Sequence, residues 1–143
     1  MTTEPGQSWI GQCNCNALRS AARRVTNFYD RCLETSGLRV TQYIILALLV
    51  ERPGLSVNEL AEALELDRTT AGKNLRPLER DGLVRVVADE ADGRSRRVEL
   101  TGRGCAAFET AMPLWKSAQA ALERRIGAEE TLGLRHTLAA IDV

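Results

Sequence analysis

A change of periodicity at Gly82 constrains the fold of this chain more than any other feature of its sequence. Before Gly82 the apolar residues recur every three or four positions, as on one face of a helix. After it they alternate with polar residues, as in a strand, and the dipeptide Asp92-Gly93 within the alternating segment is typical of a tight hairpin turn. The sequence therefore predicts helices up to this point and a two-stranded hairpin over about 83–100.

The two helices directly before the hairpin have clear start signals. Ser56 and Glu59 form a capping box, in which each side chain can accept a hydrogen bond from the other residue's amide. Asp67 is the predicted N-cap of the next helix, over about 68–80. A short helix, a tight turn and a second helix make a helix-turn-helix, and a hairpin that follows them is a wing.

Longer helical patterns flank this unit on both sides. An apolar stripe over 12–35 predicts a first helix, and Thr41 is the predicted cap of a second helix over 42–51. From Cys105 to Ile126 apolar residues recur at alternating steps of three and four, the spacing of a helix that packs along another helix. These apolar faces exceed what one small winged domain can cover, so they predict a two-fold dimer.

The expected architecture is mainly α with a small β-hairpin, in a single domain over residues 1–143. A winged helix-turn-helix DNA-binding region occupies 41–100, with the recognition helix at about 68–80. A helical dimerisation region is formed by the N- and C-terminal helices, within 12–35 and 101–143.

The helix predicted over 68–80 is the first candidate for contact with DNA. It has four basic residues against one acidic residue, although the whole chain, with 19 of each, is neutral. Small hydroxyl and amide side chains near a helix N-terminus can reach base edges and phosphates in a major groove. A solvated helix face on any surface could have the same charges. The candidate contact residues are Arg68, Thr69, Thr70, Lys73, Asn74 and Arg76.

The hairpin supplies a second group of candidates. Arginines in or after a tight turn can enter a minor groove or contact its phosphates, and an Asp two residues before an Arg can orient its guanidinium. An ordinary exposed hairpin would use Asp-Gly only to turn the chain. The candidates are Asp92, Arg94, Arg96 and Arg97.

The segment LSVNELAEALELDRTTAGKNLRPLERDGLV at 55–84 and the wing DGRSRRVELTGRG at 92–104 resemble the MarR family of winged-helix regulators. The resemblance extends over nearly the whole chain. It implies a homodimer, joined by its first and last helices, that binds a palindromic operator in double-stranded DNA. It also implies that the protein represses transcription until a small molecule or an oxidant relieves the repression. It further implies that Asp92 supports Arg94 in the minor groove. Pro77 departs from the family pattern, so we expect only Arg68 to Arg76 to read bases.

The first helix resembles in part the organic-peroxide-sensing branch of that family, which has a reactive cysteine near this point that hydrogen-bonds to tyrosines of the partner subunit. Cys15 and Tyr29 match this arrangement, whereas a second tyrosine of that branch falls at Val40 here. Fourteen residues on one helix put Cys15 and Tyr29 about 21 Å apart, so they meet only across a dimer with antiparallel first helices. The alternative is that Cys15 is a small buried hydrophobic residue.

A non-covalent effector is the competing mode of regulation. It would enter between the dimer helices and the winged domain, where the aromatic side chains of the chain gather. The residues expected near it are Trp9, Phe28, Tyr43 and Trp115.

Enzymatic function has little support in the sequence. The single histidine, His136, has no identifiable cysteine or serine partner. A glycine-rich phosphate loop and a paired-carboxylate signature are also absent from the sequence, so we expect no cofactor. The class that competes with a DNA-binding regulator is a winged-helix module that binds another protein and does not read DNA.

The cysteines and the apolar runs predict the compartment. The four cysteines read as thiols, and Cys13-x-Cys15 lacks the second ligand pair of a structural zinc site, so we expect no metal. The longest apolar run, from Tyr43 to Val50, is too short to span a bilayer. The first ten residues have no signal-peptide pattern, so we expect a cytoplasmic protein without membrane contact.

Overall fold

The computed structural model describes residues 8–91 and 93–143. Within them the chain is mostly helical, and its two strands pair antiparallel. The elements, in chain order, are α1 (Trp9–Gln12), α2 (Asn14–Leu33), a short 3-10 helix η1 (Glu34–Ser36), α3 (Val40–Glu51), α4 (Val57–Ala63), α5 (Arg68–Arg80), β1 (Val84–Ala88), β2 (Arg96–Leu100), α6 (Gly102–Ile126) and α7 (Ala128–Ala139).

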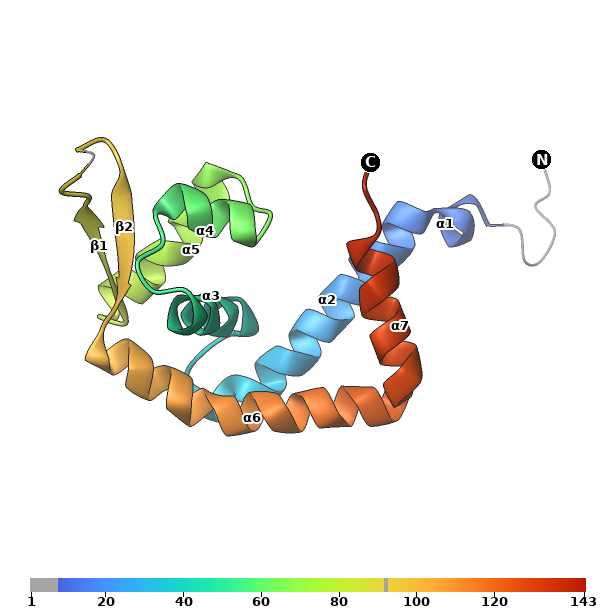
Figure 1. Ribbon diagram of the computed structural model, residues 1–143. Coiled ribbons are helices and arrows are strands. Elements are labelled where there is room, and N and C mark those ends of the chain that lie inside the picture. The colour runs from blue at the N-terminus through green and yellow to red at the C-terminus, as the bar shows by residue number, and fades with distance from the viewer. Residues whose placement is uncertain (1–7, 92) are drawn as a thin grey trace.

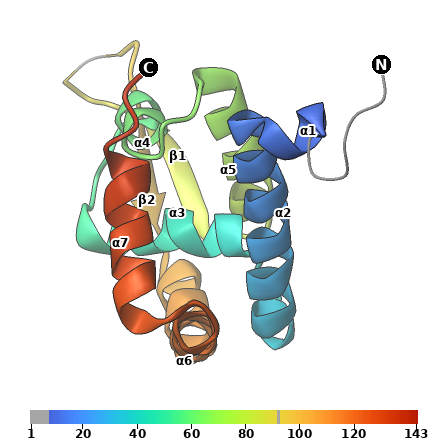
Figure 2. The ribbon, with the colours of Figure 1, turned by 90° about the vertical axis from the view of Figure 1, so that its right-hand side faces the viewer.

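The molecule consists of a body and an arm, which α6 connects along the bottom of Figure 1. The body contains α3, α4, α5 and the hairpin. The arm contains α1, the N-terminal part of α2, and α7. In the view of Figure 2, α2 and α7 rise as separate columns from the level of α6. The fold is therefore a winged helix-turn-helix with long helices to one side, as the sequence predicted.

The hydrophobic core lies in the body and at the C-terminal end of α2. Helices α2 to α5 and both strands each contribute side chains that are almost completely shielded from solvent. The largest of these are Leu33, Ile45, Leu46, Leu49, Leu60, Leu78, Val84 and Val98.

The predicted helix starts of the helix-turn-helix are confirmed. The Ser56 hydroxyl accepts from the Glu59 amide at 3.0 Å, and the Glu59 carboxylate accepts from the Ser56 amide at 3.2 Å. Asp67 Oδ1 accepts from the Thr70 amide at 2.8 Å and begins α5. After α5 the chain turns at Gly82, whose φ of 75° is in the left-handed region that glycine tolerates best.

The predicted cap at Thr41 is wrong, because α3 begins two residues earlier than expected, at Val40. Its N-cap is Arg39, whose amide donates to Gln42 Oε1 at 3.0 Å. The next amide, that of Val40, donates to Asp30 Oδ1 on α2 at 2.8 Å. The carboxylate that satisfies this helix start is ten residues away in sequence, so the local pattern did not reveal it.

The first helix, expected over 12–35, is interrupted at its start. Cys13 has an extended backbone and caps α2, with its Sγ accepting from the Asn16 amide at 3.4 Å. Residues 9–12 form the separate short helix α1. At the other end, η1 follows α2 and Gly37, with a φ of 77°, ends the helical stretch.

The predicted two-stranded hairpin is present, and its base is fixed to α6. The segment 89–95 connects β1 to β2, and the tight turn expected at Asp92-Gly93 stays a prediction because Asp92 lies outside the described residues. Val86 pairs with Val98 at the centre of the ladder. The Thr101 hydroxyl caps α6 by accepting from the Gly104 amide at 3.0 Å, and it donates to the Gly82 carbonyl at 2.6 Å. A methyl group at Gly104 would meet the backbone oxygen of Leu83, so α6 and the hairpin meet without an intervening side chain.

The residues of the apolar spacing predicted along α6 are not the ones that are fully buried. The fully buried positions are Gly104, Ala111 and Ala118, which lie beside the predicted spacing and let α6 approach the core closely. Of the predicted positions, the central ones are half-buried, whereas both ends, Cys105 and Ile126, are exposed. Gly127, with a φ of 109°, then separates α6 from α7.

Candidate nucleic-acid interface

Helix α5 presents a polar stripe on the side opposite its buried residues. Ala71, Leu75 and Leu78 anchor the helix in the core. Exposed residues follow one another at steps of four, three and four, which places them in a line along the outer surface. This set, the α5 stripe, consists of Thr69, Lys73, Arg76 and Arg80.

Two predicted contact residues of α5 lie beside this stripe. Thr70 and Asn74 are half-buried, and Asn74 lies on the flank that faces α3. The Thr70 hydroxyl donates to Asp67 Oδ2 at 2.9 Å. The hydrogen bonds from the Thr70 amide and hydroxyl lower the pKa of the Asp67 carboxyl, so the cap is formed with the ionised side chain. Thr70 thus stabilises the helix start, a role that its spacing alone did not separate from that of Thr69.

The wing flank of α5 joins the helix to the hairpin. A depression of about 270 Å³ lies between them, and its wall includes Arg68, Arg76 and Arg96. The Glu79 carboxylate at its edge accepts from the Val86 amide at 3.1 Å and fixes β1 against α5. The predicted α5 residues Arg68 and Arg76 and the wing residue Arg96 are therefore brought together on one surface.

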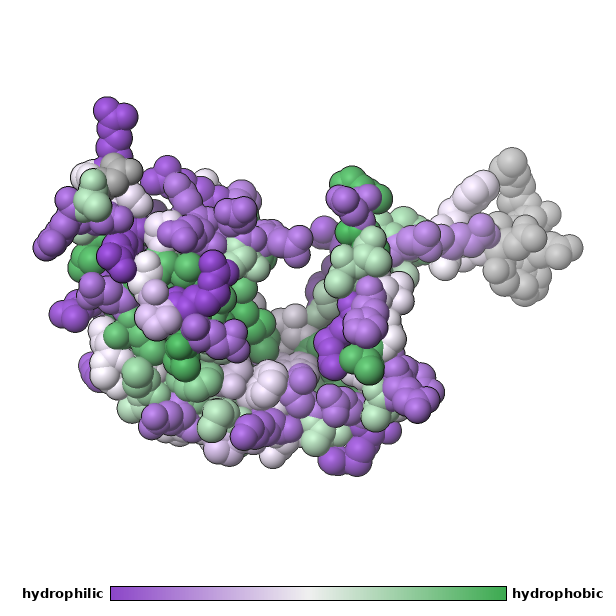
Figure 3. Space-filling model, viewed as in Figure 1, coloured by the Kyte–Doolittle hydropathy of each residue, from purple (hydrophilic) through white to green (hydrophobic). Residues whose placement is uncertain are grey.

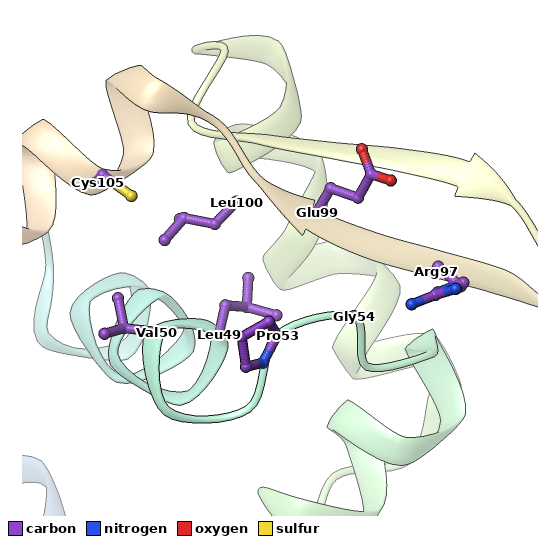
Figure 4. A pocket seen from close by; sticks show the side chains of 8 residues that line it. All are labelled: Leu49, Val50, Pro53, Gly54, Arg97, Glu99, Leu100 and Cys105. Atoms are coloured by element: carbon purple, nitrogen blue, oxygen red, sulfur yellow. The ribbon is translucent and has the colours of Figure 1, made fainter.

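Arg97 points to the other side of the hairpin. Successive side chains of a strand alternate between its faces, so Arg97 and Arg96 diverge. Figure 4 shows Arg97 reaching toward Gly54, in a cavity of about 540 Å³ that Leu100 and Cys105 also line. A Cβ at residue 54 would touch the Arg97 guanidinium. Arg97, predicted as a DNA contact, is thus separated from the surface that contains α5.

The remaining wing residues are described only in part. Arg94 is exposed in the segment that connects β1 to β2. Asp92 lies outside the described residues, and the pairing of Asp92 with Arg94 stays a prediction.

The α3 flank of α5 holds two basic residues that the predicted contact set omitted, Arg39 and Arg80, beside the predicted Lys73. A groove of about 410 Å³ runs between the start of α3 and the second half of α5, and its lining includes Arg39, Lys73 and Arg80. Pro77 lies in the same groove, and α5 continues through it to Arg80. The positive charge of Arg80 was visible in the sequence, but Arg39 is isolated there and only the fold brings it to α5.

The three candidate sensing residues lie in different surroundings. Cys15 is exposed on the outer part of α2, so it is not part of this chain's own core. Tyr29 is buried, and its hydroxyl donates to Gln119 Oε1 on α6. Burial, with the nearby negative charge of Glu123 and then Cys32, raises the pKa of Tyr29, although Arg135 lowers it. Val40, where the resemblance would place a second tyrosine, is buried.

Tyr43 belongs to an aromatic cluster between α3 and α6. Its ring stacks on those of Phe108 and Trp115, with centroid distances of 5.3 and 5.7 Å. Burial raises the pKa of its hydroxyl. Beside the cluster is a cavity of about 380 Å³, lined also by Met112 and Lys116.

Two of the four aromatic residues expected near an effector thus line one cavity. These are Tyr43 and Trp115. Phe28 packs edge-on against Tyr29, and Trp9 on α1 is exposed; neither of them lines that cavity.

In residues 8–91 and 93–143, no three His, Cys, Asp or Glu side chains are grouped as a metal site would need. Over the same residues, no individual helix has the length and apolarity for a membrane span; α2 with η1 and α3 pass only as a pair bent by 74°.

Comparison with known proteins identifies the family of this interface. Residues 36–95, from the end of η1 to the wing, match the sequence model of the MarR family. The organic hydroperoxide resistance transcriptional regulator of Bacillus subtilis is 32% identical over 100 residues, which cover 70% of this chain and 68% of that protein. The chain belongs to the MarR family. As a MarR-family member it is a DNA-binding transcriptional regulator, and its matched relatives are regulators rather than enzymes.

Solved structures of similar MarR-type regulators extend the likeness to the whole fold. The M. tuberculosis regulator MosR, solved in complex with DNA, is 38% identical with a TM-score of 0.76, covering 91% of this chain and 100% of that one. The transcriptional repressor CouR, solved bound to a 23-mer DNA duplex, is 27% identical with a TM-score of 0.83, covering 96% and 97%.

Proposed function

We propose that this MarR-family regulator binds a palindromic operator in double-stranded DNA as a homodimer. We further propose that it represses transcription until a small ligand or thiol oxidation releases it. The observation on which the DNA-binding part rests is the continuous polar and basic surface formed by the α5 stripe, Arg68 and Arg96. Because that surface must meet the chromosome, we infer a cytoplasmic location.

In the proposed complex α5 lies in the major groove and the wing lies over the adjacent backbone or minor groove. Thr69 and Arg76 are placed to reach base edges. Arg94 and Arg96 contact the wing-side DNA, with Asp92 as the proposed support of Arg94. Thr70 and Asn74 act at the edge of the contact, and Arg97 is left out because it faces the opposite side of the hairpin.

Dimerisation through the arm is supported by its uncovered apolar surface. Large hydrophobic side chains that would be costly to leave in water cluster on α1, α2 and α7. Figure 3 shows hydrophobic residues exposed among hydrophilic ones on the column that contains α7. We therefore assign dimerisation to the helices within 12–35 and 101–143. Exposed members of this set are Trp9, Ile10, Leu18, Leu132, Leu134, Leu138 and Ile141.

A palindromic site follows from the proposed dimer. A two-fold axis between two copies presents two α5 helices to the DNA in opposite orientations, so each copy meets an equivalent half-site. The relatives MosR and CouR were both solved with DNA, which supports the same use of this fold here.

Two modes of release have support in different parts of the chain. The exposed Cys15 and the likeness to a hydroperoxide resistance regulator favour oxidation. The cavity beside Tyr43, Phe108 and Trp115 favours a non-covalent ligand with an aromatic or apolar body. Because this cavity lies between α3 and α6, an occupant would contact both the body and the long connecting helix.

The DNA-binding proposal is tested with a duplex that the wild-type protein selects from a random pool. Affinity should fall steeply and log-linearly with salt. Arg96→Ala should weaken binding to all sequences, whereas Thr69→Ala should alter base preference. Arg97→Ala is the matched control on the opposite face of β2 and should leave affinity unchanged. DNA affinity that is absent or independent of salt would contradict the proposal.

The thiol route is tested separately. Wild type and Cys15→Ser are titrated onto the selected duplex with and without an organic hydroperoxide. Release of the wild type alone supports oxidation of Cys15. Equal release of both proteins would exclude Cys15 as the sensor and leave the DNA-binding proposal intact.

A further inference from the structure

The groove between α3 and α5 differs in charge from the other surfaces around the helix-turn-helix. Three basic side chains line it, Arg39 from the start of α3 and Lys73 and Arg80 from α5. Among the described residues that line it no acidic side chain occurs, and the other lining residues are Thr41, Gln42, Asn74 and Pro77. We call Arg39, Lys73 and Arg80 the α3-side cluster.

Local hydrogen bonds fix the backbone beside this cluster, but these bonds do not use its charged side chains. The Arg39 amide is bound to Gln42 and the Val40 amide to Asp30, so the start of α3 is fixed while the Arg39 side chain is exposed. Asp30 and Glu34 line a neighbouring depression on the other side of Arg39, where Arg31 accompanies them.

Arg80 has a weak existing partner. Its Nε lies 3.5 Å from Asp81 Oδ1, and both side chains are more than half exposed, at 75% and 54%. A pair in this position is screened by water and contributes little. A phosphate with a full negative charge can therefore compete for the Arg80 guanidinium, which presents several donors in a plane.

Both flanks of α5 contain several basic side chains, although Glu79 lies on the wing flank. On the wing flank Arg68, Arg76 and Arg96 surround one depression, and on the α3 flank the cluster surrounds the other. A helix in the major groove, which is about 12 Å wide, lies between two sugar-phosphate strands. Cations on both flanks can then contact both strands, whereas the wing flank alone would hold only one.

We propose that the α3-side cluster is a phosphate-binding site for the DNA strand that borders the major groove opposite the wing. This proposal rests on the proposed insertion of α5 into the major groove. The cluster contacts backbone phosphates and no bases, so it fixes the depth and orientation of α5 and adds affinity without sequence preference.

The test compares Arg39→Ala and Arg80→Ala with Arg31→Ala, a control that removes the same charge from α2 outside the groove. Affinity for the selected duplex and for an unrelated duplex is measured from 0.1 to 1 M salt. For each protomer bound, the slope of log affinity against log salt should lose about 0.9 in magnitude, and affinity at 0.1 M salt should fall about eightfold. Arg31→Ala should change the slope by much less.

Two further readouts separate phosphate binding from a structural effect. The ratio of selected to unrelated affinity should stay the same in both variants, because phosphate contacts do not read sequence. Arg39→Lys should restore most of the slope, since it keeps the charge. Thermal unfolding should be unchanged, because both arginines are exposed.

The outcomes distinguish this proposal from the one on which it rests. If Arg39→Ala and Arg80→Ala keep the wild-type slope while Arg96→Ala loses it, the α3-side cluster is not a phosphate site and α5 still binds DNA. If the wild type has no salt-dependent affinity for duplex DNA, both proposals are overturned.

Discussion

The body and the arm of this molecule are both built from helices but differ in how their apolar side chains are covered. In the body, residues such as Leu46, Leu60 and Leu78 have no exposed surface. In α7, the only buried residue is Thr131, and its large aliphatic side chains are nearly half exposed. The apolar residues of the body are therefore covered within one chain, whereas the arm presents an apolar surface that a second copy can cover.

The largest expected effect comes from the core of the body. Leu46→Ala removes a side chain with 0% exposure and should lower the free energy of unfolding by about 2–5 kcal/mol. Urea unfolding followed by circular dichroism measures this loss. If a complete body is the source of stability, Leu46→Ala should be more damaging than Leu138→Ala in the arm; equal losses would contradict the comparison.

The next effect tests the arm. Leu132→Asp combined with Leu138→Asp places two charges at exposed apolar positions of α7 and should give a folded monomer. Affinity for a palindromic duplex should then fall by at least about 100-fold, because the second half-site contact is no longer linked to the first. Sedimentation and DNA titration measure the two effects. Val50→Asp, at similar exposure on the body, should leave the dimer intact.

A smaller effect is expected where the body meets α6. Gly104→Ala would force a methyl group against the Leu83 carbonyl and Leu100, and should cost about 1–3 kcal/mol. Gly102→Ala, two residues earlier on the same helix, meets nothing within 4 Å and is the control. Thermal unfolding of both variants would show whether α6 is rigidly joined to the wing; equal melting temperatures would contradict this.

The smallest effect concerns the cap of α5 and depends on pH. Hydrogen bonds from Thr70 lower the pKa of Asp67 in the folded protein. The contribution of this carboxylate is therefore complete above the ordinary Asp pKa of about 4, and is lost as the pH falls through the lower folded pKa. The stability difference between wild type and Asp67→Ala should shrink over this interval. Asp67→Asn caps without titrating, so its difference from Asp67→Ala should stay constant.

The sequence predicted the parts of the fold that depend on neighbouring residues. The capping box at Ser56, the cap at Asp67 and the turn at Gly82 each require partners only a few positions away, and all three are confirmed. The start of α3 was misplaced because Val40 is held by Asp30, a partner on another helix.

The sequence could predict the candidate interface only within single helices and strands, and not how they come together. The spacing within α5 identified a polar face, but it did not separate the exposed Thr69 from Thr70, which binds Asp67. Alternation in β2 implied that Arg96 and Arg97 diverge, yet which of them faces α5 depends on how the hairpin packs. Arg39 joins the surface only when α3 and α5 are placed side by side.

The central claim is that the body binds DNA while the arm joins two copies on one operator. The most direct measurement is the mass of the complex formed with a palindromic duplex selected by the wild-type protein, determined by sedimentation over a range of salt concentrations. The account predicts two chains per duplex and an affinity that falls steeply with salt. One chain per duplex at undiminished affinity, or an affinity that does not change with salt, would contradict it.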